Sequence, residues 1–183
     1  FYEPMLFRHC GPYYTKGYAE VDVAMITVAP MDRFGNFSFG LTNCAQQEML
    51  DRAKIIIVEV NESMPVIFGK TNDHIHISQV DAIVECSQPI AVTPPSAPAT
   101  EEDIAIANFI FPYLEDEITL QLGIGGMPDT LGNLIAESDL KDLGMHTELM
   151  SNAYLKLYET GKINDRKKAI DRGKGVFGIC NGT

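Results

Sequence analysis

The chain has 183 residues, of which 45% are hydrophobic and 21% charged, and its formal net charge is −11. The hydrophobic fraction excludes a disordered chain, and four Cys are too few for a disulfide scaffold. The acidic excess argues against binding to nucleic acid or an anionic membrane, since both attract clustered Lys and Arg. No segment approaches the roughly 18 apolar residues of a membrane span. With no CxxC spacing and no recognisable signal peptide, we expect a soluble cytoplasmic protein with reduced thiols.

The first half of the chain has the pattern of a parallel α/β unit. Residues 21–28 and 55–60 are apolar and β-branched, which is typical of strands covered on both faces. Residues 43–54 between them have helical spacing, with apolar positions repeating every four residues. A strand, a helix and a strand in this order predict a right-handed parallel crossover. Residues 83–86 predict one more short strand.

A Pro-rich segment separates this pattern from a second one. Residues 87–100 hold four Pro and almost no charge, which predicts a semi-extended linker. A helix is expected from Thr100, with three acidic residues in its first turn, and Pro112 should kink or end it. The pattern then predicts strands at 118–122, 143–147 and 176–180 and helices at 129–136 and 150–160. The predicted fold class is therefore α/β, with two successive parallel-sheet units.

A glycine-rich turn, Gly123-Ile124-Gly125-Gly126-Met127-Pro128, lies between a predicted strand and a predicted helix. Its glycines permit a tight turn, and the N–H groups near a helix start suit an anion or an oxyanion. The turn lacks the third glycine of the dinucleotide fingerprint and the Lys-Ser/Thr pair of a P-loop. Two interpretations remain from these residues, namely anion binding and a purely structural turn.

The segment Gly144-Met-His-Thr-Glu148 ends the next predicted strand, where open α/β sheets place their ligands. Glu148 is a candidate nucleophile, base or metal ligand, and the alternative is a cap or dipole partner of the following helix. His146 precedes it by two residues, so both side chains should lie on one face of a strand.

Two further groups of residues are candidate sites. His74 and His76 alternate in an extended segment, but no third ligand is spaced to complete a metal site, so we favour solvent-facing residues. A basic run carries five of the 14 Lys and Arg residues, and it suits either a phosphate or a solvated loop. Its members are Arg166, Lys167, Lys168, Arg172 and Lys174.

The glycine turn, together with Leu143-Gly-Met-His-Thr-Glu-Leu149, resembles the acetate CoA-transferase and acetyl-CoA hydrolase family. Within it, the chain is most similar to the butyryl-CoA and 4-hydroxybutyrate-CoA:acetate CoA-transferases. Residues 29–40, 58–65 and 173–178 support the resemblance. It implies that the chain is an internal portion of a protein roughly twice as long. Residues 1–90 would be the latter part of the N-terminal domain, and residues 91–100 a Pro-rich linker. Residues 101–183 would be the first part of the C-terminal domain, which carries the catalytic Glu.

The resemblance also implies an activity and its residues. Glu148 would be the catalytic nucleophile, and Gly123, Ile124, Gly125, Gly126 and Met127 would contact the CoA substrate. CoA would pass from butyryl-CoA or 4-hydroxybutyryl-CoA to acetate through a glutamyl-CoA thioester, in butyrate and fatty acid metabolism. No metal and no cofactor beyond CoA as substrate is implied, and the partners would be acyl-CoA, a small carboxylate and further copies of the chain. An acyl-CoA hydrolase and a non-catalytic CoA-binding fragment are the alternatives.

Overall fold

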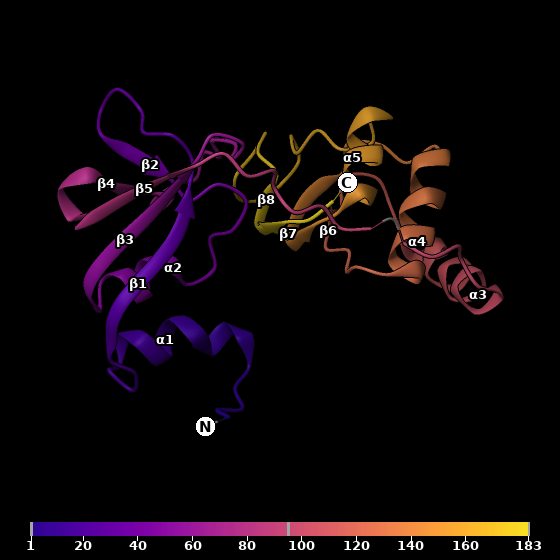
Figure 1. Ribbon diagram of the computed structural model, residues 1–183. Helices are drawn as coiled ribbons and strands as arrows, with labels where there is room; N and C mark the ends of the chain where they lie inside the picture. The colour runs from indigo at the N-terminus through magenta and orange to yellow at the C-terminus, as the bar shows by residue number, and fades with distance from the viewer. Residues whose placement is uncertain (1, 95, 183) are drawn as a thin grey trace. The chain divides into compact units, whose positions relative to one another are not determined.

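The computed structural model describes residues 2–94 and 96–182 (Figure 1). The fold is α/β with parallel sheets, as the sequence predicts. The chain divides into two compact units between Ala91 and Val92. The described residues between 87 and 100 form neither helix nor strand. Within the described residues, none of the helices has the length and apolar character that crossing a bilayer requires.

The first unit is built on a three-stranded parallel sheet in the order β1-β3-β5 (Figure 1). These strands span Val21–Val28, Ala53–Asn61 and Ala82–Cys86. Each consists mostly of apolar and β-branched residues, whose side chains suit a pleated surface. The predicted strands at 21–28, 55–60 and 83–86 are therefore confirmed to within two residues.

Only one face of this sheet is buried in the unit. Ala24, Val28, Ile56 and Val58 pack into the core, whereas the neighbouring Met25 is 73% exposed. The expectation that 21–28 is covered on both faces is therefore wrong within the unit. Buried and exposed side chains alternate along the strands with a period of about two residues, as in a sheet with only one packed face.

The predicted helix at 43–54 is wrong in its extent. Helix α2 spans only Gln46–Leu50, and Ala53 already begins β3, where it pairs with Val21 of β1. An antiparallel pair, β2 (Asn36–Ser38) with β4 (His74–His76), was not predicted. The unit also contains the 3₁₀ turn η1 (Phe7–His9), helix α1 (Cys10–Thr15) and the 3₁₀ turn η2 (Ile77–Gln79).

The second unit has a parallel sheet in the order β6-β7-β8, with β7 in the centre. The strands span Thr119–Leu120, Gly144–Met150 and Val176–Cys180. The last of these matches its prediction residue for residue. The first is shorter than predicted, and the central strand runs three residues beyond its predicted end.

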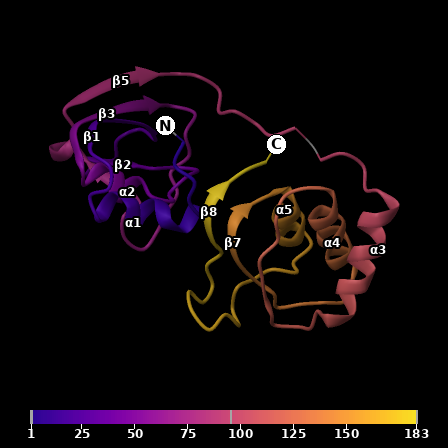
Figure 2. The ribbon, with the colours of Figure 1, turned by 90° about the horizontal axis from the view of Figure 1, so that it is seen from below.

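Three helices lie to one side of β7 and β8, with α4 packed between α3 and α5 (Figure 2). They span Glu101–Ile110, Gly126–Glu137 and Asn152–Glu159, and the 3₁₀ turn η3 (Phe111–Tyr113) follows α3. Thr100 and Asp103 form a capping box at the start of α3, as its predicted start requires. Apolar residues of the helices and of β6 and β7 form one core.

Candidate active site

Glu148 lies on the face of β7 that points away from the core. Met145 and Thr147 are buried, whereas His146 and Glu148 are exposed, so the two exposed side chains share a face as predicted from the period of a strand. Helix α5 begins at Asn152 and has no acidic residue in its first turn. Glu148 is therefore a strand residue, and its interpretation as a helix cap is excluded.

The glycine turn connects β6 to α4. Gly125 is the N-cap of α4 and adopts φ 118° and ψ 178°, a region that essentially only glycine occupies. The N–H of Asp129 donates to the carbonyl of Gly125 at 3.1 Å. The earlier N–H groups of Gly126 and Met127 lack an intrahelical acceptor, as in any first helical turn, and Pro128 has no N–H. The turn thus has two helix-start donors available for an anion.

The register of the sheet brings the glycine turn to the level of Glu148. Leu120 of β6 pairs with Met145 of β7, and the same register continued by three residues along each chain would bring Gly123 level with Glu148. One hydrogen bond extends the alignment beyond the ladder, because the hydroxyl of Thr147 lies 3.3 Å from the carbonyl oxygen of Leu122. The glycine turn and the segment that contains Glu148 therefore both lie at the carboxyl ends of neighbouring strands of one sheet.

Tyr154 of α5 supports the end of β6 from the core side. Its phenol oxygen accepts a hydrogen bond from the N–H of Leu122 at 2.6 Å and donates to the carbonyl of Leu120 at 3.3 Å. Burial raises the pKa of Tyr154, and the opposing effects of Thr147 and of the Leu122 N–H are smaller. The sequence alone does not reveal this role of Tyr154, since nothing about a Tyr on a helix face indicates which backbone group it bonds to.

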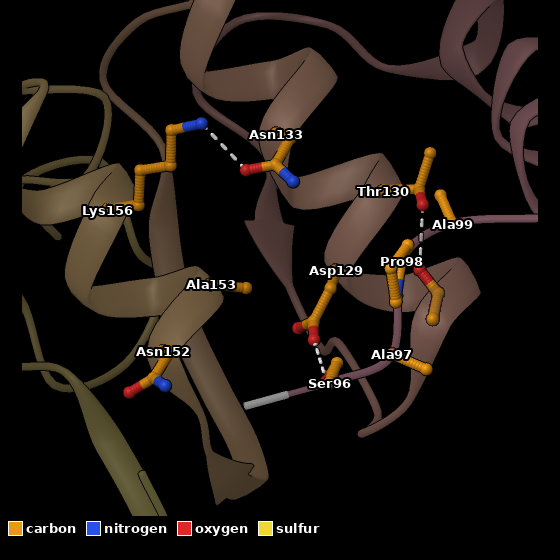
Figure 3. Close-up of a pocket in the computed structure, with 11 residues that line it drawn as sticks. Ser96, Ala97, Pro98, Ala99, Asp129, Thr130, Asn133, Asn152, Ala153 and Lys156 are labelled. Atoms are coloured by element: carbon orange, nitrogen blue, oxygen red, sulfur yellow. Dashed lines mark hydrogen bonds between the residues drawn. The ribbon is translucent and has the colours of Figure 1, made fainter. Parts of the chain in front are cut away.

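A surface pocket of about 340 Å³ lies beside the start of α4 (Figure 3). Asp129 bonds to Ser96 at one side of it, and Lys156 donates to Asn133 at 2.7 Å at the other. Gly126 also lines the pocket, but Glu148 does not. The pocket is therefore adjacent to the glycine turn and separate from the candidate nucleophile.

The basic run is not a free cationic surface. Lys168 is only 2% exposed, and its Nζ donates to the carbonyls of Met145 at 2.7 Å and Lys174 at 2.6 Å. Lys167 pairs with Glu117 at 2.7 Å, and Nε of Arg172 donates to the carbonyl of Lys168 at 3.1 Å. The phosphate-site interpretation and the solvated-loop interpretation are both wrong for Lys168, because its ammonium group is buried and hydrogen-bonded to backbone carbonyls.

The two histidines of β4 have local partners. Nδ1 of His74 lies 2.6 Å from Oδ1 of Asp73, and Nδ1 of His76 lies 2.8 Å from the hydroxyl of Ser78. Among residues 2–94 and 96–182, no three His, Cys, Asp or Glu side chains are grouped in a way that could hold a metal ion. The hydrogen bonds of His74 and His76 thus lie within β4 and the residues next to it.

The sequence of the chain matches a known family model and several known proteins. The model of the acetyl-CoA hydrolase/transferase N-terminal domain matches residues 3–94. The butyryl-CoA:acetate CoA-transferase of Anaerostipes caccae is 44% identical over 184 residues, which cover 100% of this chain and 41% of that protein. The 4-hydroxybutyrate coenzyme A transferase of Clostridium kluyveri is 37% identical, with the same coverage. The chain thus spans about two fifths of the length of these curated relatives.

Solved structures agree along the whole chain. The 4-hydroxybutyrate CoA-transferase from Porphyromonas gingivalis superposes with a TM-score of 0.89 at 31% identity, covering 99% of this chain and 46% of that one. RipA from Yersinia pestis superposes with a TM-score of 0.90 at 34% identity, covering 100% and 41%. The match of the family model over half of the sequence places the chain in the acetyl-CoA hydrolase/transferase family, to which it belongs.

Proposed function

We propose that the native protein is a CoA-transferase that exchanges CoA between a short-chain acyl-CoA, such as butyryl- or 4-hydroxybutyryl-CoA, and acetate. The observation that supports the proposal is the register of β6 and β7, whose continuation would bring the backbone of Glu148, an exposed residue, level with the glycine turn. Relatives named as butyryl-CoA:acetate and 4-hydroxybutyrate transferases support the substrate class.

Glu148 acts in this proposal as a covalent nucleophile. Its carboxylate attacks the thioester carbonyl of the acyl-CoA, CoA leaves as a thiolate, and an acyl-glutamyl anhydride remains. The thiolate then attacks the glutamyl carbonyl, which releases the free carboxylate and leaves a γ-glutamyl-CoA thioester. Acetate attacks this thioester in turn, and the same two steps in reverse give acetyl-CoA and the original Glu148.

The glycine turn has a matching task. Each attack creates a tetrahedral oxyanion, and a carboxylate is a weak nucleophile, so the reaction needs close placement and stabilisation of that charge. The N–H groups of Gly126 and Met127 have no intrahelical acceptor and are suited to this stabilisation. Loss of one such donor typically lowers kcat by about 10²–10³-fold.

The covalent intermediate gives a direct test. The complete native protein is incubated with butyryl-CoA without acetate and then treated with borohydride, which reduces a glutamyl thioester to an alcohol. We expect loss of activity and a mass change at Glu148, whereas Glu148→Gln should be inactive before treatment and show no mass change. A mass change at another residue, or full activity of Glu148→Gln, would falsify the assignment.

Hydrolysis of acyl-CoA is the second candidate, because acetyl-CoA hydrolases are also relatives, such as the Neurospora crassa protein at 25% identity. Water would then replace acetate in the attack on the glutamyl thioester. A transferase incorporates labelled acetate into acyl-CoA with ping-pong kinetics, whereas a hydrolase releases free CoA thiol without acetate. If the protein binds CoA and does neither, it is a non-catalytic binding module.

A further inference from the structure

The backbone of Leu122 is anchored on both of its polar sides, one residue before the glycine turn starts. Its N–H donates to the phenol oxygen of Tyr154 at 2.6 Å, and its carbonyl lies 3.3 Å from the hydroxyl of Thr147. Leu122 is buried, as are both partners. An unpaired backbone group at such a place would be costly, so the two side chains satisfy a real requirement.

These side chains replace a sheet ladder that has ended. The pairing of β6 with β7 stops at Leu120 and Met145, two residues short of Leu122. Tyr154 spans the gap, because its hydroxyl also donates to the carbonyl of Leu120 at 3.3 Å. The end of β6 is thus held by a side chain from α5 rather than by strand pairing.

The anchor matters because the middle of the turn after it, at Ile124 and Gly125, has little packing of its own. Ile124 is 56% exposed, and a Cβ added at Gly125 would meet no atom within 4 Å. Glycines at such positions leave the backbone free to move. The fixed peptide at Leu122 therefore sets where the turn begins, and with it the distance from the turn to Glu148.

Thr147 connects the same anchor to the strand of the nucleophile. It precedes Glu148 on β7 and points to the opposite, buried face. Its hydroxyl lies 3.0 Å from the carbonyl of Leu149 and 3.3 Å from that of Leu122, and it also hydrogen-bonds with the phenol of Tyr154. A movement of Leu122 relative to β7 would break its bond to Thr147.

We infer that Tyr154 is a positioning residue for CoA transfer: its hydroxyl fixes Leu122 and so holds the glycine turn in register with Glu148. The inference rests on the proposed function, since it assigns Tyr154 a role in that reaction. Tyr154 does not touch substrate and acts through the turn alone. It supplies the placement on which oxyanion stabilisation depends, where an error of about 1 Å can cost a hundredfold in rate.

The test compares two tyrosines of one helix in the complete native protein. Tyr154→Phe removes only the anchoring hydroxyl, and Tyr158→Phe makes the same change at a residue that is 71% exposed. We expect kcat per active site, counted by borohydride trapping, to fall about tenfold to a hundredfold in Tyr154→Phe, with KM for acyl-CoA within about threefold. Tyr158→Phe should match the unmodified enzyme.

A purely structural role would lower the number of trapped sites and leave kcat per site unchanged, and that result overturns the inference. A second pair of variants covers the case in which Tyr154→Phe does not fold. Thr147→Val should lower kcat per site and Thr147→Ser should restore it, and equal rates of the two would also overturn the inference. Glu148→Gln is measured in parallel: if it keeps full activity, the proposed function itself fails and the role of Tyr154 fails with it.

Discussion

Asp165 and Lys168 form a buried ion pair, with Oδ1 and Nζ 3.8 Å apart, and together they bind both backbone polar groups of Met145. Oδ1 of Asp165 accepts from the N–H of Met145 at 2.7 Å, and Nζ of Lys168 donates to its carbonyl at 2.7 Å. The ladder with β8 begins only at the pair His146–Val176. The ion pair therefore satisfies the backbone hydrogen bonds of β7 at Met145, one residue before the pairing with β8 begins.

Replacing Lys168 should destabilise the protein far more than replacing its neighbour. Lys168→Met leaves the Asp165 carboxylate buried without its counter-charge, which typically costs about 3–5 kcal/mol. Lys167→Met removes an exposed pair with Glu117, worth about 0–1 kcal/mol. Urea unfolding of the complete native protein measures both. Equal losses in the two variants would show that the buried pair does not support β7.

Gly125 should be sensitive to any side chain because of its backbone. At φ 118° an Ala costs about 1–3 kcal/mol of strain, which the exposed turn would relieve by changing shape. We therefore expect Gly125→Ala to lower kcat by about 10²–10³-fold, as for a lost oxyanion donor. Gly161→Ala is the matched control, since Gly161 has φ 71° and open space around it but follows α5. If both variants keep full kcat, the shape of the turn does not matter to the reaction.

The sequence predicted strands better than it predicted the helix at 43–54. Residues 21–28 and 176–180 are mostly apolar, and the structure has strands with these same bounds. The four-residue repeat in 43–54 was misleading, because Ala53 contributes to that repeat and belongs to β3. A periodic pattern does not show where a helix gives way to a strand.

The candidate site could be predicted only in part, because a local pattern does not show which distant residues contact it. The shared face of His146 and Glu148 follows from the two-residue period of a strand. The support for that site comes from distant residues: Tyr154 bonds to a backbone 32 residues away, and Lys168 to one 23 residues away. Nothing in the sequence around Lys168 distinguishes a buried amine from the exposed amine of Lys167.

The length of the side chain at Glu148 should matter as well as its charge. Glu148→Asp keeps a carboxylate but withdraws it by one methylene, and a misplacement of about 1 Å can cost a hundredfold in rate. We expect kcat/KM to fall by at least about this factor, with a borohydride-trapped adduct still formed at position 148. Glu137→Gln, at the exposed end of α4, is the control and should leave kcat/KM unchanged. Wild-type kcat/KM in Glu148→Asp would contradict a role as nucleophile.

Helices α4 and α5 approach each other closely at Gly132 and Ala153. A Cβ added at Gly132 would lie 2.9 Å from Cβ of Ala153, so an Ala there forces the helices apart. Such overpacking typically costs about 1–3 kcal/mol, against a gain of about 1 kcal/mol in helix propensity. Gly132→Ala should therefore lower the unfolding midpoint, and adding Ala153→Gly should recover part of the loss. Strictly additive effects in this double-mutant cycle would contradict direct contact.

The phenol of Tyr154 predicts a specific loss of stability in alkaline solution. Burial raises the pKa of Tyr154 in the folded protein above its ordinary value of about 10, so the folded state favours the neutral phenol. Its contribution to stability is fully present below about pH 10 and is lost as the pH rises through the folded pKa, because the unfolded chain ionises first. In Tyr154→Phe there is no phenol at this position to ionise. The urea midpoint of its unfolding should lie below that of the unmodified protein at pH 8, and the difference between the two midpoints should narrow above about pH 10. Tyr158→Phe, at an exposed position of the same helix, should follow the unmodified protein over the whole range, and a constant gap for Tyr154→Phe would show that the phenol does not titrate as described.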